Sequence, residues 1–165
     1  MKIVILGLSI TSSWGNGHAT TYRGLVRELI ARGHDVLFLE RDQPWYAEHR
    51  DLAPSDELGV RLYPAVAALR EEFADEVANA DCVVVGSYVP EGIAVGTWVN
   101  ETAGGLTAFY DIDTPVTLAA LRHNACDYLS VPLIGSYDLY LSFTGGPTLQ
   151  VLEKEFGAAQ AEAFY

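Results

Sequence analysis

The chain is 165 residues long; half of its residues are hydrophobic, 19% are charged, and its formal net charge is -12. These values fit one compact globular domain rather than a disordered chain. The strong negative charge repels phosphate backbones and anionic lipid headgroups, so we expect neither nucleic acid nor a membrane surface as a partner.

The two cysteines, Cys82 and Cys126, belong to no Cys-x-x-Cys or His/Cys pattern. We therefore expect reduced thiols and no metal site. The apolar run Ile3–Leu6 is too short for a signal peptide, and no stretch approaches the roughly 18 apolar residues of a membrane-spanning helix. These observations predict a cytoplasmic protein without a membrane span.

In chain order, the first predicted element is the strand Ile3–Leu6, whose continuous apolar run is typical of a parallel strand covered on both faces. The pattern then changes to a period of 3.6 residues, which predicts a helix over His18–Arg32. Gly33 ends that helix as a C-terminal cap, and Val36–Leu39 follows as a second buried strand.

The rest of the chain continues the alternation of apolar runs and helix-period stripes. The pattern predicts a short helix within Trp45–Arg50, a strand at 60–63, a helix at 66–80, a strand at 82–86, a helix opened by Pro90, a strand at 106–110, a helix from Pro115 to about His123, a strand at 137–143, and a helix from Pro147 to about Phe156. The chain then stops at Phe164–Tyr165, so we expect that last helix to need a further surface to pack against.

Strands that alternate with helices through short connections predict an α/β fold. The expected architecture is a Rossmann-like three-layer domain with a mostly parallel sheet. No repeat, linker or low-complexity tract interrupts the pattern, which indicates a single domain over residues 1–165.

In such a sheet, ligands bind beyond the carboxyl ends of the strands. The loop from Gly7 to Gly17 follows the first strand and is longer than a structural turn requires. Glycines allow a backbone to approach a ligand, and free amides at a helix start favour an anion. We predict that Gly15, Asn16 and Gly17 contact a ligand; the alternative is that the glycines only permit a turn and Asn16 only caps the helix.

A dinucleotide site is one alternative for this loop. Its fingerprint requires Gly-x-Gly-x-x-Gly directly after the first strand, and Gly7, Gly15 and Gly17 have the wrong spacing. Glu40 does end the second strand where a ribose-binding acid would lie. No Gly-Lys-Ser/Thr follows the first strand, so a Walker loop is absent as well. Because the ribose-binding acid is present but the glycine fingerprint is not, an NAD site is disfavoured.

Three segments carry a resemblance to a known family. Residues 15–36, GNGHATTYRGLVRELIARGHDV, resemble the opening of GT-B glycosyltransferases, where a glycine-containing loop precedes a helix closing in Leu-x-x-Arg-Gly-His-x-Val. Residues 109–115, FYDIDTP, and 137–147, YDLYLSFTGGP, are similar to a narrower bacterial group, the spore-maturation CgeB-like proteins. The resemblance spans nearly the whole chain.

The resemblance implies one half of a GT-B architecture, with this chain as the N-terminal, acceptor-side domain. The C-terminal domain, which binds the nucleotide-sugar, is absent from the chain and would be supplied in cis or in trans. The resemblance also implies that no metal or cofactor is needed beyond the nucleotide-sugar donor. His18 falls where several GT-B families carry a histidine that acts as general base on the acceptor hydroxyl, a task that suits an imidazole. The alternative is that His18 merely caps the helix.

Further residues fall in the loops of the expected cleft. Asp111 and Asp113 follow a strand and could accept sugar hydroxyls; we favour Asp111 for acceptor contact, because Asp113 or Thr114 also suits the cap of the helix opened by Pro115. Thr144 and Gly145 follow the last predicted strand and are assigned to substrate binding.

Aromatic and basic residues complete the candidate site. Trp14 and Trp45 are placed to stack on sugar rings. Arg41 could pair with a phosphate, but a surface salt bridge is the favoured interpretation.

The favoured function is sugar transfer from a nucleotide-sugar to a carbohydrate or glycosylated acceptor, carried out only when a second domain completes the enzyme. The alternatives are a stand-alone nucleotide- or carbohydrate-binding module and an NAD-dependent oxidoreductase. A face left open by the absent domain would favour self-association into a homo-oligomer.

Overall fold

The computed structural model describes residues 1–55 and 58–165. Its strands are β1 (Lys2–Gly7), β2 (Asp35–Arg41), β3 (Val60–Tyr63), β4 (Cys82–Gly86), β5 (Leu106–Asp111), β6 (Leu139–Ser142) and β7 (Ala161–Ala163). Its helices are α1 (His18–Ala31), α2 (Pro44–Ala47), α3 (Val66–Glu72), α4 (Ala74–Ala78), α5 (Gly92–Thr102), α6 (Thr114–Arg122), α7 (Val131–Ile134) and α8 (Pro147–Lys154).

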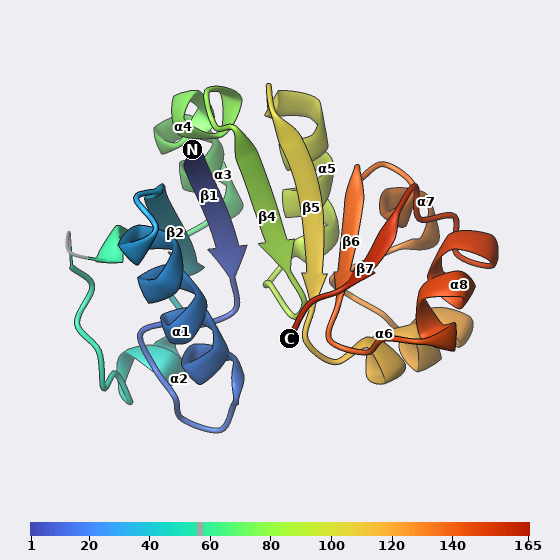
Figure 1. Cartoon of the computed structure of the whole chain (residues 1–165). Helices are drawn as coiled ribbons and strands as arrows, with labels where there is room; N and C mark the ends of the chain where they lie inside the picture. The colour runs from blue at the N-terminus through green and yellow to red at the C-terminus, as the bar shows by residue number, and fades with distance from the viewer. Residues whose placement is uncertain (56–57) are drawn as a thin grey trace.

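The seven strands form one sheet in the order β3-β2-β1-β4-β5-β6-β7, and every strand pairing in the described residues is parallel. The α/β, Rossmann-like prediction is therefore confirmed. The strands point the same way, so their carboxyl ends share one edge, at the bottom of Figure 1.

The two faces of the sheet are covered unequally. One face buries a large cluster in which residues such as Val4, Val85 and Phe109 pack against side chains of α3 to α8. On the other face a smaller cluster packs around Tyr22 and Val26 of α1. Figure 1 shows α1 on one side of the sheet and α5 on the other, which gives the three layers.

The end of the chain differs from the prediction. The structure places a short edge strand, β7, after α8, and Phe164 packs edge-on against Tyr110 with ring centroids 5.2 Å apart. The chain therefore does not stop directly after a helix, as the pattern suggested. Three residues of strand give too short an alternation to be recognised in the sequence.

Other element boundaries also moved. The helix predicted over 66–80 is divided into α3 and α4 at Phe73, whose backbone leaves the helical region. α5 begins at Gly92 rather than at Pro90, and α7 was not predicted.

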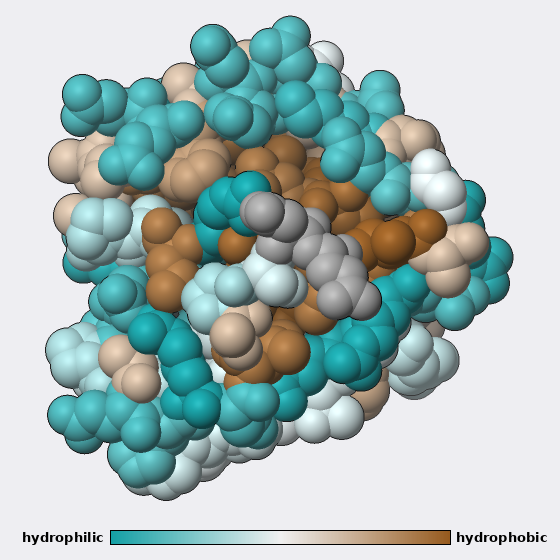
Figure 2. Space-filling view, turned by 90° about the vertical axis from the view of Figure 1, so that its left-hand side faces the viewer, coloured by the Kyte–Doolittle hydropathy of each residue, from teal (hydrophilic) through white to brown (hydrophobic). Residues whose placement is uncertain are grey.

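The surface seen in Figure 2 combines polar and apolar residues. Figure 2 views the side of the molecule where β2 and α1 lie, with hydrophilic residues around the margin and hydrophobic residues gathered toward the middle. Among the described residues, no helix is long and apolar enough to cross a membrane. Within residues 1–55 and 58–165, no group of three or more His, Cys, Asp or Glu side chains is arranged so that it could hold a metal ion.

Candidate functional site

The point where the chain reverses its direction through the sheet lies between β1 and β4. From β1 the chain proceeds outward to β2 and β3, and then returns to β4 on the other side of β1. The loops after β1 and β4 therefore diverge, and ligands of open α/β sheets bind in the crevice between such loops. These loops are residues 8–17 and 87–91.

Loop 8–17 is anchored by a buried carboxylate at the end of β2. Glu40 is fully buried; its Oε2 accepts hydrogen bonds from the backbone N–H groups of Ile10 (2.6 Å) and Thr11 (2.9 Å). Its Oε1 accepts one from Thr11 Oγ1 at 2.6 Å. Glu40 therefore holds the loop and is not presented to a ribose, which removes the one element that favoured an NAD site.

A second anchor comes from the segment after α2. Asp51 accepts a hydrogen bond from Ser13 Oγ at 2.5 Å and forms an ion pair with Arg23. The hydrogen bonds from Arg23 and Ser13 hold the pKa of Asp51 far below its usual range. Arg23 Nε also donates to the Ile10 carbonyl at 2.8 Å. The loop is thus fixed on two sides.

The residues predicted to contact a ligand in this loop divide into two kinds. Asn16 is used within the protein, because its Oδ1 accepts a hydrogen bond from Ala19 N–H (3.3 Å) and its Nδ2 donates to Trp14 O (3.1 Å). Asn16 thus supports the start of α1 from the position before the N-cap residue, Gly17, and its contact with a ligand stays a prediction. Gly15, at φ 67°, and Gly17 have open space where a side chain would lie. Trp14 is half exposed and stacks on His49 with centroids 4.3 Å apart.

His18 lies at the start of α1, facing the loops after β4 and β5. It is 5% exposed, and its Nε2 is 3.9 Å from Asp113 Oδ2. The Tyr88 ring packs edge-on against the imidazole at 5.4 Å. Burial lowers the pKa of His18, and the nearby Asp113 opposes that shift only in part. Burial therefore favours the neutral form of the imidazole, which is the form that can accept a proton.

Nδ1 of the same ring is buried and has no hydrogen-bond partner within residues 1–55 and 58–165. A buried, unpaired ring nitrogen is costly, and such atoms are few in native proteins. The side chain is therefore not accounted for by a capping role alone.

Asp111 does not face the cleft, in contrast to the prediction. It is fully buried: its Oδ2 accepts a hydrogen bond from Tyr140 Oη (2.6 Å), and its Oδ1 accepts one from Thr117 Oγ1 (2.8 Å). Burial raises the pKa of Asp111, while the Tyr140 and Thr117 hydrogen bonds lower it. Asp111 ties β5 to β6 and α6, and the carboxylate presented toward His18 belongs to Asp113, whose side chain is 49% exposed.

Thr144 and Gly145 lie after β6, on the far side of the β5 loop from His18. Thr144 is partly exposed, and its backbone N–H donates to Ser142 Oγ at 3.0 Å. A β-carbon at Gly145 would collide with the hydroxyl of Tyr165. The structure therefore brings His18 and Asp113 together but places these two residues apart from them.

Tyr88 was missed by the sequence analysis. It has φ 63°, and Glu91 in the same loop has φ 55°. Residues other than glycine rarely adopt this left-handed region, and such residues cluster at functional sites. Nothing in the local sequence signals these angles, because both residues are held by contacts distant in the chain.

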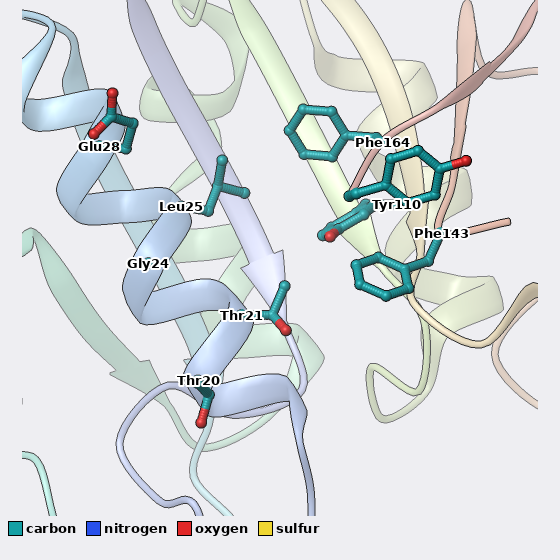
Figure 3. Close-up of a pocket in the computed structure, with 9 residues that line it drawn as sticks. Thr20, Thr21, Gly24, Leu25, Glu28, Tyr110, Phe143 and Phe164 are labelled. Carbon is teal, nitrogen blue, oxygen red and sulfur yellow. The ribbon is translucent and has the colours of Figure 1, made fainter. Parts of the chain in front are cut away.

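A groove of about 480 Å³ runs beside this site, between α1 and the aromatic residues near the chain's end. Figure 3 shows Thr21 and Gly24 of α1 on one side and Tyr110, Phe143 and Phe164 on the other. Phe143 is 39% exposed. The groove was not predicted, because Phe164 and Tyr165 were interpreted as an unsupported chain end.

Comparison with solved structures supports the fold. One match is an alpha-glucosyltransferase in complex with UDP-glucose and DNA containing an abasic site, with a TM-score of 0.63 and 15% identity. Another is an alpha-glucosyltransferase in complex with UDP and a 13-mer DNA containing a HMU base, with a TM-score of 0.62 and 15% identity. Each match covers 98% of this chain and 41% of the other chain.

This chain thus has the fold of part of a glycosyltransferase and spans less than half the length of those enzymes. No family model matches it, and no curated protein does. The expectation that nucleic acid is excluded as a partner is not borne out, because both matched enzymes are bound to DNA. The net charge of one domain does not decide this question, since recognition depends on the local charge of a site.

Proposed function

We propose that this chain is the acceptor-binding half of a two-domain, metal-independent glycosyltransferase that uses a nucleotide-sugar donor. The proposal is supported by the match of 98% of the chain to 41% of a glucosyltransferase, which leaves room in that enzyme for a second domain. A second domain, in cis or in trans, would bind the donor across the crevice. Membership of the CgeB-like group remains a prediction from the sequence.

The observation that carries the chemistry is a buried His18 beside Asp113, at the reversal point of the sheet. In the proposed reaction, the acceptor hydroxyl gives its proton to His18 as its oxygen forms a bond to the anomeric carbon of the donor. The bond from that carbon to the diphosphate oxygen breaks, and the diphosphate leaves with the electron pair. The proton remains on the imidazole until it is lost to water.

Asp113, and not Asp111, is assigned the second catalytic role, which is to stabilise the protonated form of His18. Its Oδ2 lies 3.9 Å from His18 Nε2, so its negative charge stabilises the imidazolium that forms when the acceptor proton arrives. Trp14, 52% exposed, and Trp45, 50% exposed, offer faces on which acceptor sugar rings would stack. Gly15 and Gly17 leave the backbone beside them open to that acceptor.

The test is replacement of His18 by Gln in the enzyme completed with its second domain. We expect kcat to fall by about 10²-fold or more, with a smaller change in KM, because the base acts only in the transition state. His123→Gln is the matched control, since His123 is exposed at the C-terminal end of α6, away from the carboxyl edge of the sheet. An unchanged kcat in His18→Gln would reassign the residue to structure.

The two-domain part of the proposal has its own test. The purified 165-residue chain should show no steady transfer from a nucleotide-sugar to any acceptor. Steady transfer would contradict the need for a second domain. Tight binding of uridine diphosphate to the chain alone would instead favour the stand-alone binding module.

A further inference from the structure

An ion pair joins the end of β2 to the loop after β4, at the carboxyl edge of the sheet. Arg41 ends β2 and Glu91 precedes α5, and Arg41 Nη1 lies 2.9 Å from Glu91 Oε2. Because β1 lies between β2 and β4, this pair spans the crevice in which ligands of such sheets bind. The interpretation of Arg41 as a salt-bridged residue is confirmed, but the pair lies at the carboxyl edge rather than on a remote surface.

The guanidinium of Arg41 is held in place independently of Glu91. Its side chain is only 18% exposed, and its Cζ lies 5.9 Å from the centroid of the Tyr63 ring. By contrast, Arg23 and Arg50 at the same edge bond to loop 8–17, through Ile10 O and Thr11 Oγ1. Arg41 is thus a positioned cation that does not serve to anchor that loop.

Glu91 reaches Arg41 from an unfavourable backbone conformation. It is the N-cap residue of α5 with φ 55° and ψ 34°, and its side chain makes no capping hydrogen bond to that helix. The side chain is 56% exposed, so it can turn into solvent without leaving a buried charge. Its carboxylate pairs with Arg41, and the residue directly precedes the first turn of α5. A guanidinium and a helix N-terminus each attract an anion.

A third donor lies beside the pair. Tyr63 is fully buried, and its hydroxyl has no hydrogen-bond partner within the described residues. Burial raises the pKa of Tyr63, the charge of Arg41 lowers it, and that of Glu91 raises it. The guanidinium of Arg41 lies over the Tyr63 ring, so this ring is beside the ion pair. A buried hydroxyl without a partner is costly, and an oxyanion at this position would accept its hydrogen bond.

We propose that Arg41, the Tyr63 hydroxyl and the first turn of α5 form a phosphate-binding site in which the Glu91 carboxylate occupies the place of the ligand. A phosphate displaces Glu91 and takes its contact with Arg41, since guanidinium groups bind carboxylates and phosphates through similar geometry. The site goes beyond the proposed function and does not depend on His18.

The test is an NMR titration of the 165-residue chain with inorganic phosphate at constant ionic strength. We expect the amide signals of Gly92 and Ile93 to shift. Glu91→Gln should tighten binding about fivefold by removing the competing carboxylate, Tyr63→Phe should weaken it about threefold, and Arg41→Gln should abolish it. Glu28→Gln, which breaks the exposed Arg32–Glu28 pair on α1, is the matched control and should leave the affinity unchanged.

The proposal is overturned if Arg41→Gln binds phosphate as the wild type does, or if neither the wild type nor Glu91→Gln binds it. Two further probes distinguish the sources of the phosphate. UDP-glucose binding that follows the same order of variants identifies the donor and would favour the stand-alone nucleotide-binding module over the acceptor-binding half proposed above. Glucose 6-phosphate binding that follows the same order identifies a phosphorylated acceptor. Either result leaves the kinetic test of His18 unaffected, so the two proposals fail separately.

Discussion

Loop 8–17 and loop 87–91 lie on either side of the crevice, but they are held in different ways. The first is fixed by buried hydrogen bonds to Glu40 and by the Asp51–Arg23 pair. The second contains two residues in the left-handed region and is tied across the crevice by the Arg41–Glu91 pair, in which only the Glu91 side chain is half exposed. The polar residues of the long loop mostly support the fold, whereas the Arg41–Glu91 pair of the short loop is the contact that the proposed phosphate would replace.

The largest expected effect concerns the anchor of loop 8–17. Glu40→Ala removes a buried carboxylate that accepts three hydrogen bonds and leaves their donors unpaired. The free energy of unfolding should fall by roughly 3 kcal/mol, measured by urea denaturation. Glu28→Ala, on the exposed face of α1, should change it by less than about 0.5 kcal/mol. Equal losses in both variants would mean that the loop is not rigidly anchored.

Relief of the backbone strain at Glu91 in loop 87–91 should raise the stability of the protein. In an Arg41→Gln background, where no ion pair remains to be lost, Glu91→Gly should raise the free energy of unfolding by about 1 kcal/mol. The gain arises because glycine adopts φ 55° without a steric cost. Glu91→Ala in the same background serves as the control, and an equal gain there would contradict the role of the backbone angle.

A smaller loss is expected from Asn16, which supports the start of α1 from within the long loop. Asn16→Ala removes the hydrogen bond from Ala19 N–H and should lower the free energy of unfolding by about 0.5–1 kcal/mol. Asn16→Asp keeps the acceptor oxygen and should retain most of that stability. If Asn16→Ala abolished acceptor binding while leaving stability unchanged, ligand contact would be its main role.

The smallest expected effect is on the pH dependence of the free energy of unfolding. It concerns His18, which lies between the two loops. Because its pKa is lowered in the folded state, the unfolded chain binds more protons just below pH 6.5. Stability should therefore decrease as the pH falls from 6.5 toward the lowered pKa. His18→Asn should flatten that part of the curve, and a slope equal to that of the wild type would show that other groups cause it.

The site could be predicted only in part. The position of His18 at the start of α1 and of Asp113 after β5 followed from apolar runs and helix periods, because the carboxyl ends of parallel strands share one edge. Which of two nearby aspartates faces the crevice could not be read from the sequence. The orientation of Asp111 depends on Tyr140, which is 29 residues away in the chain, and on Thr117, which is 6 residues away. Both donate hydrogen bonds to its buried carboxylate.

By itself, the sequence determined the α/β class, the helices and strands with strong periodicity, and the edge of the sheet where ligand binding is predicted. Those features depend on local patterns of burial that a single element displays. Only the tertiary structure decided the use of each polar side chain. Glu40 became an anchor, Asp111 was buried, and Glu91 was drawn into an ion pair with Arg41, fifty residues away in the chain. Hydrogen bonds and ion pairs join residues distant in sequence, so their choice of partner is fixed by packing and not by spacing.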